Sequence, residues 1–130
     1  MYEIEKKEFG FKLTFGGLIS GEEMQAWVAD SKKELADAPD AFGVFVDMRT
    51  LKPIPVDAQV HMQEGQQLYK DKGMERSVVI VDSSVTKMQF QRIARRTGID
   101  EWERYIDASE DPGWQKTGMD WIVRGVDPAQ

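Results

Sequence analysis

Three aspartates stand at the ends of apolar, strand-like runs of this sequence. Asp47 follows "FGVFV", Asp82 follows "VVIV" and Asp107 ends "ERYID". Because ligands of parallel sheets bind beyond the carboxyl ends of the strands, these carboxylates are candidates to meet at one edge. Carboxylate oxygens suit Mg²⁺, and Arg49 or Lys87 would then receive a phosphate. A magnesium-dependent enzyme is therefore one hypothesis.

The alternative is that each aspartate only ends its strand or caps the following turn, as aspartate commonly does at such junctions. Ser83 and Ser84 follow Asp82 directly and precede a periodic helical segment, so the three residues look like a phosphorylatable Asp-Ser-Ser element. Free amides at a helix start need acceptors, which serine hydroxyls provide. We interpret the serines as capping residues, and we expect no metal and no cofactor.

The only histidine is His61, which excludes a metal site built from several histidines. It lies on an expected helix beside Gly65 and Leu68, and no serine or cysteine with nucleophile spacing accompanies it. We interpret it as a packing residue rather than a general base.

One expected helix is basic in an otherwise acidic chain, and it carries Lys87, Arg92, Arg95 and Arg96. Positions 92, 95 and 96 share a face. This face would dock an acidic partner or an anionic lipid headgroup. The other interpretation is that arginines in the last turn offset the negative end of the helix dipole, and the two roles are compatible.

Four tryptophans are many for this length, at positions 27, 102, 114 and 121. Their helical spacing favours packing in the core or at an interface over a ligand cage. Trp114 and Trp121 lie on the last expected helix. If they are exposed there, they become candidates for contact with a partner or with a second copy in a homodimer.

The composition narrows the class of protein. The chain has 130 residues, a net charge of −6 and no cysteine. We expect one domain over residues 1–130 with a loose tail from about residue 125. The absence of cysteine indicates a reducing, cytoplasmic compartment. No run of residues is apolar enough for a signal peptide or a membrane span. The negative net charge makes nucleic acid an unfavourable partner.

Hydrophobic periodicity predicts nine elements. The alternation in "FKLTF" and the short apolar runs predict strands over residues 2–9, 10–15, 42–46, 76–82 and 103–107. Helical spacing predicts helices over 20–35, 58–69, 85–98 and 112–125, with a capping box at Ser20 and Glu23 and a terminal glycine at Gly98. The order β-β-α-β-α-β-α-β-α predicts an α/β fold with a mixed, mostly parallel sheet and helices packed on it in two layers.

This order and two segments resemble a known family. "GMERSVVIVDSSVTKMQFQRIARRTGIDEWERYIDASED" resembles the C-terminal half of STAS domains, the anti-sigma-factor antagonist fold, and "FGVFVDMRTL" resembles the strand before it. The SpoIIAA-like group of small bacterial proteins, related in fold to lipid-binding CRAL-TRIO domains, is the nearest match. In the family, the phosphorylated Ser or Thr follows the "VFVD"-type strand. Residues 53–59 occupy that place and contain neither Ser nor Thr.

The resemblance implies a fold and a class of function. Our leading hypothesis is a non-enzymatic regulatory or protein-interaction module without the family's phosphorylation site. The alternative is a small-molecule or lipid carrier related in fold to CRAL-TRIO domains. The magnesium-dependent enzyme is the third.

Overall fold

The computed structural model describes residues 1–129, and the elements follow each other in the predicted order. The strands are β1 (Tyr2–Lys7), β2 (Gly10–Gly17), β3 (Phe42–Leu51), β4 (Met74–Val81) and β5 (Glu103–Asp107). The α-helices are α1 (Gly21–Glu34), α2 (Val56–Lys72), α3 (Ser84–Thr97) and α4 (Trp114–Arg124). Short 3₁₀ turns, η1 (Leu35–Asp37) and η2 (Ile99–Glu101), follow α1 and α3.

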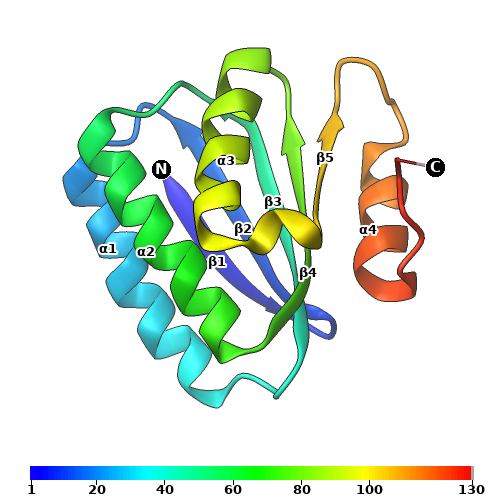
Figure 1. Ribbon diagram of the computed structural model, residues 1–130, viewed down its shortest axis with the longest axis horizontal. Helices are drawn as coiled ribbons and strands as arrows, with labels where there is room; N and C mark the ends of the chain where they lie inside the picture. Colours follow the sequence, from blue (N-terminus) through cyan, green and yellow to red (C-terminus); the bar gives the residue numbers. More distant parts are fainter. Residues whose placement is uncertain (130) are drawn as a thin grey trace.

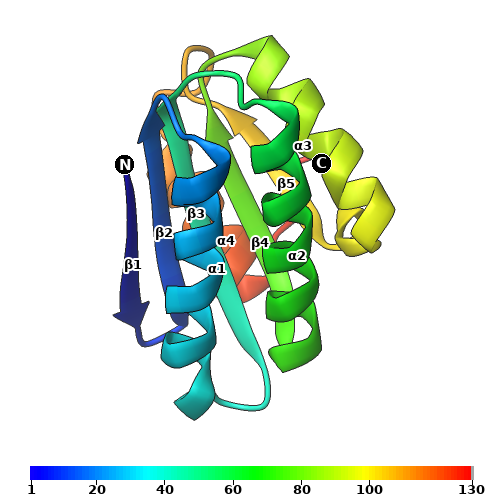
Figure 2. The same cartoon turned by 90° about the vertical axis from the view of Figure 1, so that its left-hand side faces the viewer.

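The strands form one mixed sheet in the order β1-β2-β3-β4-β5. The β1–β2 pair is antiparallel and the other three pairs are parallel, which confirms the predicted mixed, mostly parallel sheet. When each parallel strand lies directly beside the previous one, crossovers of one hand place their helices on one face. Helices α1, α2 and α3 lie on that face (Figures 1 and 2).

The expectation of two layers was wrong, because α4 lies on the opposite face of the sheet (Figure 1). Helix α4 follows the last strand and belongs to no crossover, so the handedness rule does not assign it a face. It packs on β3, β4 and β5. Gly118 allows the close approach, since a Cβ there would lie 2.7 Å from Cε2 of Phe45.

Strand β3 continues past Asp47, where we expected it to end, and reaches Leu51. Its pairing with β2 resumes beyond an irregularity, with Gly16 opposite Thr50 and Gly17 opposite Leu51. A bulge of this kind redirects side chains without ending the strand. The bulge leaves Asp47 within the strand and turns Arg49 outward.

Each face of the sheet has its own apolar core. The core under α1, α2 and α3 is the larger, and the core under α4 comprises Phe45, Val78, Ile80, Ile106, Trp121 and Ile122. The predicted stripe on α2 is buried, with Ala58, Met62, Gly65 and Tyr69 all facing the larger core.

Trp27 of α1 organises the larger core where α1 crosses α2. Its ring stacks on Tyr69 with 5.7 Å between centroids and meets the edge of Phe15 at 5.2 Å. Gly65 of α2 lies against the indole, and a Cβ on Gly65 would lie 1.9 Å from Cζ3 of Trp27. The absence of a side chain at Gly65 therefore sets the separation of the two helices.

Helix ends follow the predicted capping chemistry. The Ser20 hydroxyl accepts a hydrogen bond from the amide of Glu23 at 3.1 Å. Gly73 and Gly98 end α2 and α3 in the left-handed conformation that glycine adopts at low cost.

Residues 125–129, where we expected a loose tail, contact the body of the protein. The Arg104 guanidinium donates two hydrogen bonds to the carboxylate of Asp127, both at 3.0 Å. Within residues 1–129, no helix combines the length and the apolar character that a membrane span requires.

We predict that Gly65→Ala destabilises the protein. A methyl group at 1.9 Å from a buried indole carbon forces Trp27 or α2 to move. Overpacking of this kind costs ~1–3 kcal/mol of unfolding free energy. Replacing glycine by alanine in a helix gains about 1 kcal/mol in helix propensity, so the net effect is destabilising. Urea unfolding monitored by circular dichroism would measure the change.

Gly113→Ala is the matched control, because Gly113 has an ordinary backbone conformation and its new Cβ would meet only the flexible Asp111 carboxylate at 3.4 Å. Its cost should stay below about 1 kcal/mol. An unfolding free energy of Gly65→Ala equal to that of the wild type would show that Trp27 does not set the helix separation.

Candidate functional site

The carboxylate of Asp47 is already bound by a neighbouring side chain. Nε and Nη2 of Arg49 donate to its two oxygens at 3.0 and 2.9 Å, and the Arg49 amide donates at 3.1 Å. Burial raises the pKa of Asp47, but these hydrogen bonds, the Arg49 charge and the Lys12 charge together hold the pKa below its ordinary value. Asp47 is therefore ionised and internally neutralised.

The three strand-end aspartates do not converge. Asp47 is opposite Ile80, which packs under α4, whereas Asp107 is opposite Val81, which packs under the other helices. Asp47 and Asp107 therefore point to opposite faces, and Asp82 lies exposed beyond β4. Nowhere in residues 1–129 do three carboxylate or histidine side chains form a group that could hold a metal ion.

Asp107 is satisfied locally by the turn after β5. Its Oδ1 accepts hydrogen bonds from the hydroxyl of Ser109 at 2.6 Å and from its amide at 2.9 Å. These bonds, with a smaller contribution from the Lys87 charge, lower the pKa of Asp107. This is the structural role that we weighed against metal binding.

The two serines after Asp82 lie at the start of α3. The Ser83 hydroxyl accepts a hydrogen bond from the amide of Thr86 at 3.3 Å, which confirms the capping interpretation for Ser83 only. Ser84 is the first residue of the helix and is exposed. His61 is half-buried on α2, with Nδ1 3.2 Å from Oε1 of Glu64.

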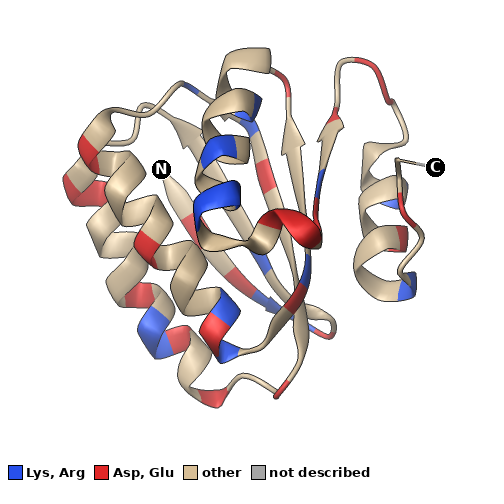
Figure 3. Ribbon diagram, in the orientation of Figure 1, with Lys and Arg blue, Asp and Glu red and all other residues tan. Residues whose placement is uncertain are grey.

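The outer side of α3 carries five exposed residues at intervals of one, three and four, which is the spacing of one helix face. We call it the α3 surface, and it comprises Val85, Met88, Arg92, Arg95 and Arg96. Val85 is 55% exposed and Met88 is 60% exposed, and the two lie three residues apart on this face, so they form an apolar pair. The helix contains no acidic residue, and its basic residues are visible in Figure 3.

The arginines of the α3 surface are not needed to cap their own helix. Nζ of Lys70, from α2, donates to the carbonyl of Thr97 at 2.9 Å, and the amide of Gly98 donates to the carbonyl of Ala94. Across residues 1–129, no carboxylate lies within 4.0 Å of the three guanidinium groups. The last carbonyls of α3 therefore have other donors, and Arg95 and Arg96 still lie in the last turn, where a positive charge interacts favourably with the helix dipole.

The two tryptophans of α4 are packed against the protein. Trp121 is 8% exposed, and its Nε1 donates to the carbonyls of Ser77 at 2.9 Å and Trp102 at 3.2 Å. Trp114 is half-buried under the Arg49 guanidinium, whose Cζ lies 4.2 Å from the ring centroid. Neither is an exposed anchor, so the argument for a homodimer through α4 loses its basis.

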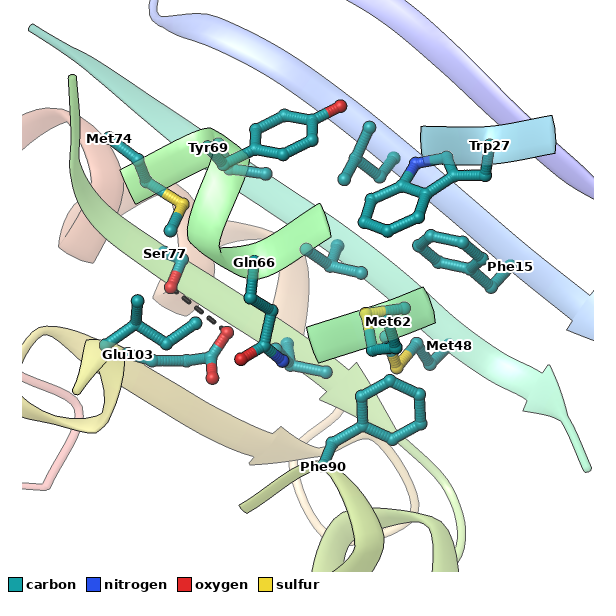
Figure 4. A pocket seen from close by; sticks show the side chains of 15 residues that line it. Phe15, Trp27, Met48, Met62, Gln66, Tyr69, Met74, Ser77, Phe90 and Glu103 are labelled. Carbon is teal, nitrogen blue, oxygen red and sulfur yellow. Dashed lines mark hydrogen bonds between the residues drawn. The ribbon is translucent and has the colours of Figure 1, made fainter. Parts of the chain in front are cut away.

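A cavity of about 30 Å³ lies in the larger core between the sheet and the helices (Figure 4). Phe15, Trp27 and the methionines Met48 and Met62 line its apolar end. The volume suffices for about one or two water molecules, and it is about a tenth of the smallest usual ligand pocket.

The other end of the cavity is polar and centres on Glu103, which is 7% exposed. The Ser77 hydroxyl donates to Oε1 of Glu103 at 3.1 Å, and the Tyr105 hydroxyl donates to Oε2 at 2.8 Å. Gln66 lies beside them and accepts a hydrogen bond from the Thr97 hydroxyl at 2.9 Å (Figure 4).

Burial raises the pKa of Glu103 to about 7, although hydrogen bonds from Tyr105 and Ser77 oppose the shift. Burial and the neighbouring Glu103 carboxylate raise the pKa of Tyr105, which keeps its hydroxyl as the donor. The sequence analysis missed this cluster. The available signal was a glutamate at the first position of an expected strand, although β5 is an edge strand and acids are rarely buried without a partner.

Comparisons with models of protein families, with curated proteins and with solved structures found no match to this chain.

We predict that Glu103→Gln removes a pH dependence of stability. The Glu103 pKa is about 7 in the folded protein and about 4.3 in an unfolded chain, so the folded state holds an extra proton between these values. The free energy of unfolding therefore falls as the pH rises through this interval. In the wild type, this loss of unfolding free energy reaches about 3 kcal/mol above pH 7. Glutamine imitates the protonated acid, so the variant does not lose this stability.

Urea unfolding at about pH 5 and about pH 8 would measure the effect. Glu101→Gln is the control, because Glu101 is exposed in the same segment. If the free energy of unfolding changes by the same amount between the two pH values in Glu103→Gln and in Glu101→Gln, Glu103 does not titrate as described.

Proposed function

We propose that the protein is a non-enzymatic interaction module whose α3 surface docks an acidic partner protein. The observation that carries this proposal is the combination on one helix face of two exposed apolar side chains and three arginines, with no acidic residue in the helix itself. Interfaces combine apolar and arginine contacts of this kind, whereas an ordinary solvated face contains charges of both signs.

The apolar half of the α3 surface adjoins the start of α2. The amide of Ile54 donates to Oε1 of Gln89, and Nε2 of Gln89 donates back to the carbonyl of Ile54, so the loop before α2 is fixed to α3. Val56 and Val60, in the first turns of α2, are 76% and 54% exposed. A partner seated on Val85 and Met88 would therefore find further apolar contacts beside them.

Charge favours a different protein as the partner over a second copy. A symmetric dimer brings the same patch of both copies together, so six arginines would meet in one interface. The α3 surface contains no acidic residue that could pair with them. Like charges at an interface cost several kcal/mol, whereas an acidic partner satisfies each guanidinium with charge-assisted hydrogen bonds.

The resemblance to STAS and SpoIIAA-like domains also supports a regulatory module, since the antagonists of that family act by binding other proteins. The carrier and enzyme hypotheses receive less support. The cavity in the larger core has a volume of only about 30 Å³, and the strand-end aspartates lie on different faces of the sheet or in solvent.

We predict that a photo-crosslinking residue at Met88 forms one adduct of defined mass in an extract of the cells that make the protein. Arg92→Glu with Arg95→Glu should reduce the adduct at least about tenfold, because each reversal replaces an attraction by a repulsion. Mass spectrometry of the crosslinked band measures the yield and identifies the partner, which should present an acidic surface and bind the purified protein in a salt-sensitive manner.

Lys32→Glu with Lys33→Glu is the matched control, since it makes the same change of charge on the exposed end of α1. This variant should retain the adduct, and a crosslinker at Val123 on α4 should not form it. An adduct that survives the reversal at positions 92 and 95 would contradict the proposal. So would an adduct with a second copy of this chain, or arginine-dependent binding to anionic lipid vesicles without a protein partner.

A further inference from the structure

A groove of about 290 Å³ runs along α4 on the face of the sheet that this helix only partly covers. Its walls are Phe9, from the turn between β1 and β2, and Trp114 and Met119 of α4, and Phe45 of β3 contributes to its floor. Figures 1 and 2 show α4 on the side of the sheet opposite to α1, α2 and α3. The groove is therefore separate from the α3 surface.

Two lysines reach the groove because of the alternation along the hairpin strands. Phe11 and Leu13 of β2 point into the larger core, so Lys12 between them points to the α4 face. Lys7 of β1 lies on the same face, with Nζ 3.8 Å from Oε1 of Glu5. Within residues 1–129, no carboxylate lies within 4.0 Å of Nζ of Lys12.

The carboxylate of Asp47, two residues along β3 from Phe45, is neutralised in place. Arg49 holds both carboxylate oxygens of Asp47, and its guanidinium stacks on Trp114. The stacking fixes the indole that forms one wall, and the ion pair removes a repulsion that Asp47 would exert on an anion. Glu5 pairs with Lys7 and is opposite Lys12 in the β1–β2 register, so it offsets one of the two lysine charges and one positive charge remains beside the groove.

We propose that this groove binds a small anion with a planar aromatic body, such as an aromatic carboxylate or sulfonate. Phe45 and Trp114 pack against each other, with 6.3 Å between ring centroids, so the ring of the ligand lies against Phe9, Met119 and the open edge of Trp114. The anionic group contacts Lys12 and Lys7. The volume of the groove is near the lower end of ligand pockets, which suits a ligand of two or three rings. The apolar walls would supply the binding free energy, and the lysines would select the anion.

The experiment compares two dyes of matched shape. The probes are 1-anilinonaphthalene-8-sulfonate and N-phenyl-1-naphthylamine, which have the same rings with and without the sulfonate. Each is titrated into the full-length protein, and binding is followed by dye fluorescence and by the indole N–H signals in ¹⁵N NMR spectra. The protein has four tryptophans, and Trp114→Phe identifies the signal of Trp114.

We expect the sulfonate dye to bind with one-to-one stoichiometry and to shift the Trp114 indole signal. Lys12→Met keeps the length of the side chain and removes its charge. The Kd of the sulfonate dye for this variant should therefore rise about fivefold or more, and the Kd of the neutral dye should change less than about twofold. Lys6→Met is the matched control, because Lys6 lies next along β1 to Lys7 and points to the opposite face, where it pairs with Glu34. It should change neither Kd.

Three results would overturn the proposal: no saturable binding of the sulfonate dye, binding that leaves the Trp114 signal unshifted, or equal Kd values for wild type and Lys12→Met. Val85→Ser with Met88→Ser separates this site from the α3 surface, since it removes the exposed apolar residues of that surface. Dye binding that is lost in this variant would place the dye on the α3 surface and would also overturn the proposal. Dye binding that persists there supports the groove, whatever the crosslinking at Met88 shows.

Discussion

Strand β4 must be covered on both of its faces, and the rest of the structure depends on this constraint. Val78 and Ile80 point to one face and Val79 and Val81 to the other, and none of them is more than 2% exposed. Each such side chain contributes roughly 1.5–3 kcal/mol when it is buried, so an open face would sacrifice much of the stability of a small domain. The crossover helices cover one face, and only α4 remains to cover the other.

The incomplete cover by α4 explains where the surface can bind other molecules. One helix spans three strands, so the hairpin side of its face remains open, and the alternation of β2 places Lys12 there beside aromatic side chains. On the other side of the sheet, α3 is the last of the three helices that form one layer, and no other element of residues 1–129 covers its outer face. The two surfaces therefore lie on opposite sides of the sheet.

The polar interior around Glu103 is a different solution to burial. Ser77 and Tyr105 supply hydrogen bonds to the carboxylate but no positive charge, so the protein accommodates the acid by favouring its protonated form. The Ser77 backbone also links the two cores, because its carbonyl accepts the Trp121 indole N–H from α4. Ser77 of β4 is therefore in contact with both the Glu103 carboxylate and the core under α4.

The sequence by itself determined the order of the elements, the parallel sheet and the caps at Ser20, Ser83 and Gly98, because periodicity and capping are local properties of the chain. It also predicted the basic face of α3, since residues three or four apart on a helix must share a side. Only the tertiary structure decided the face that α4 covers, the continuation of β3 past Asp47 and the separation of the three aspartates. These depend on strand register and on contacts between residues distant in the chain, and for the same reason the Glu103 cluster and the Lys12 groove are recognisable only in the folded protein.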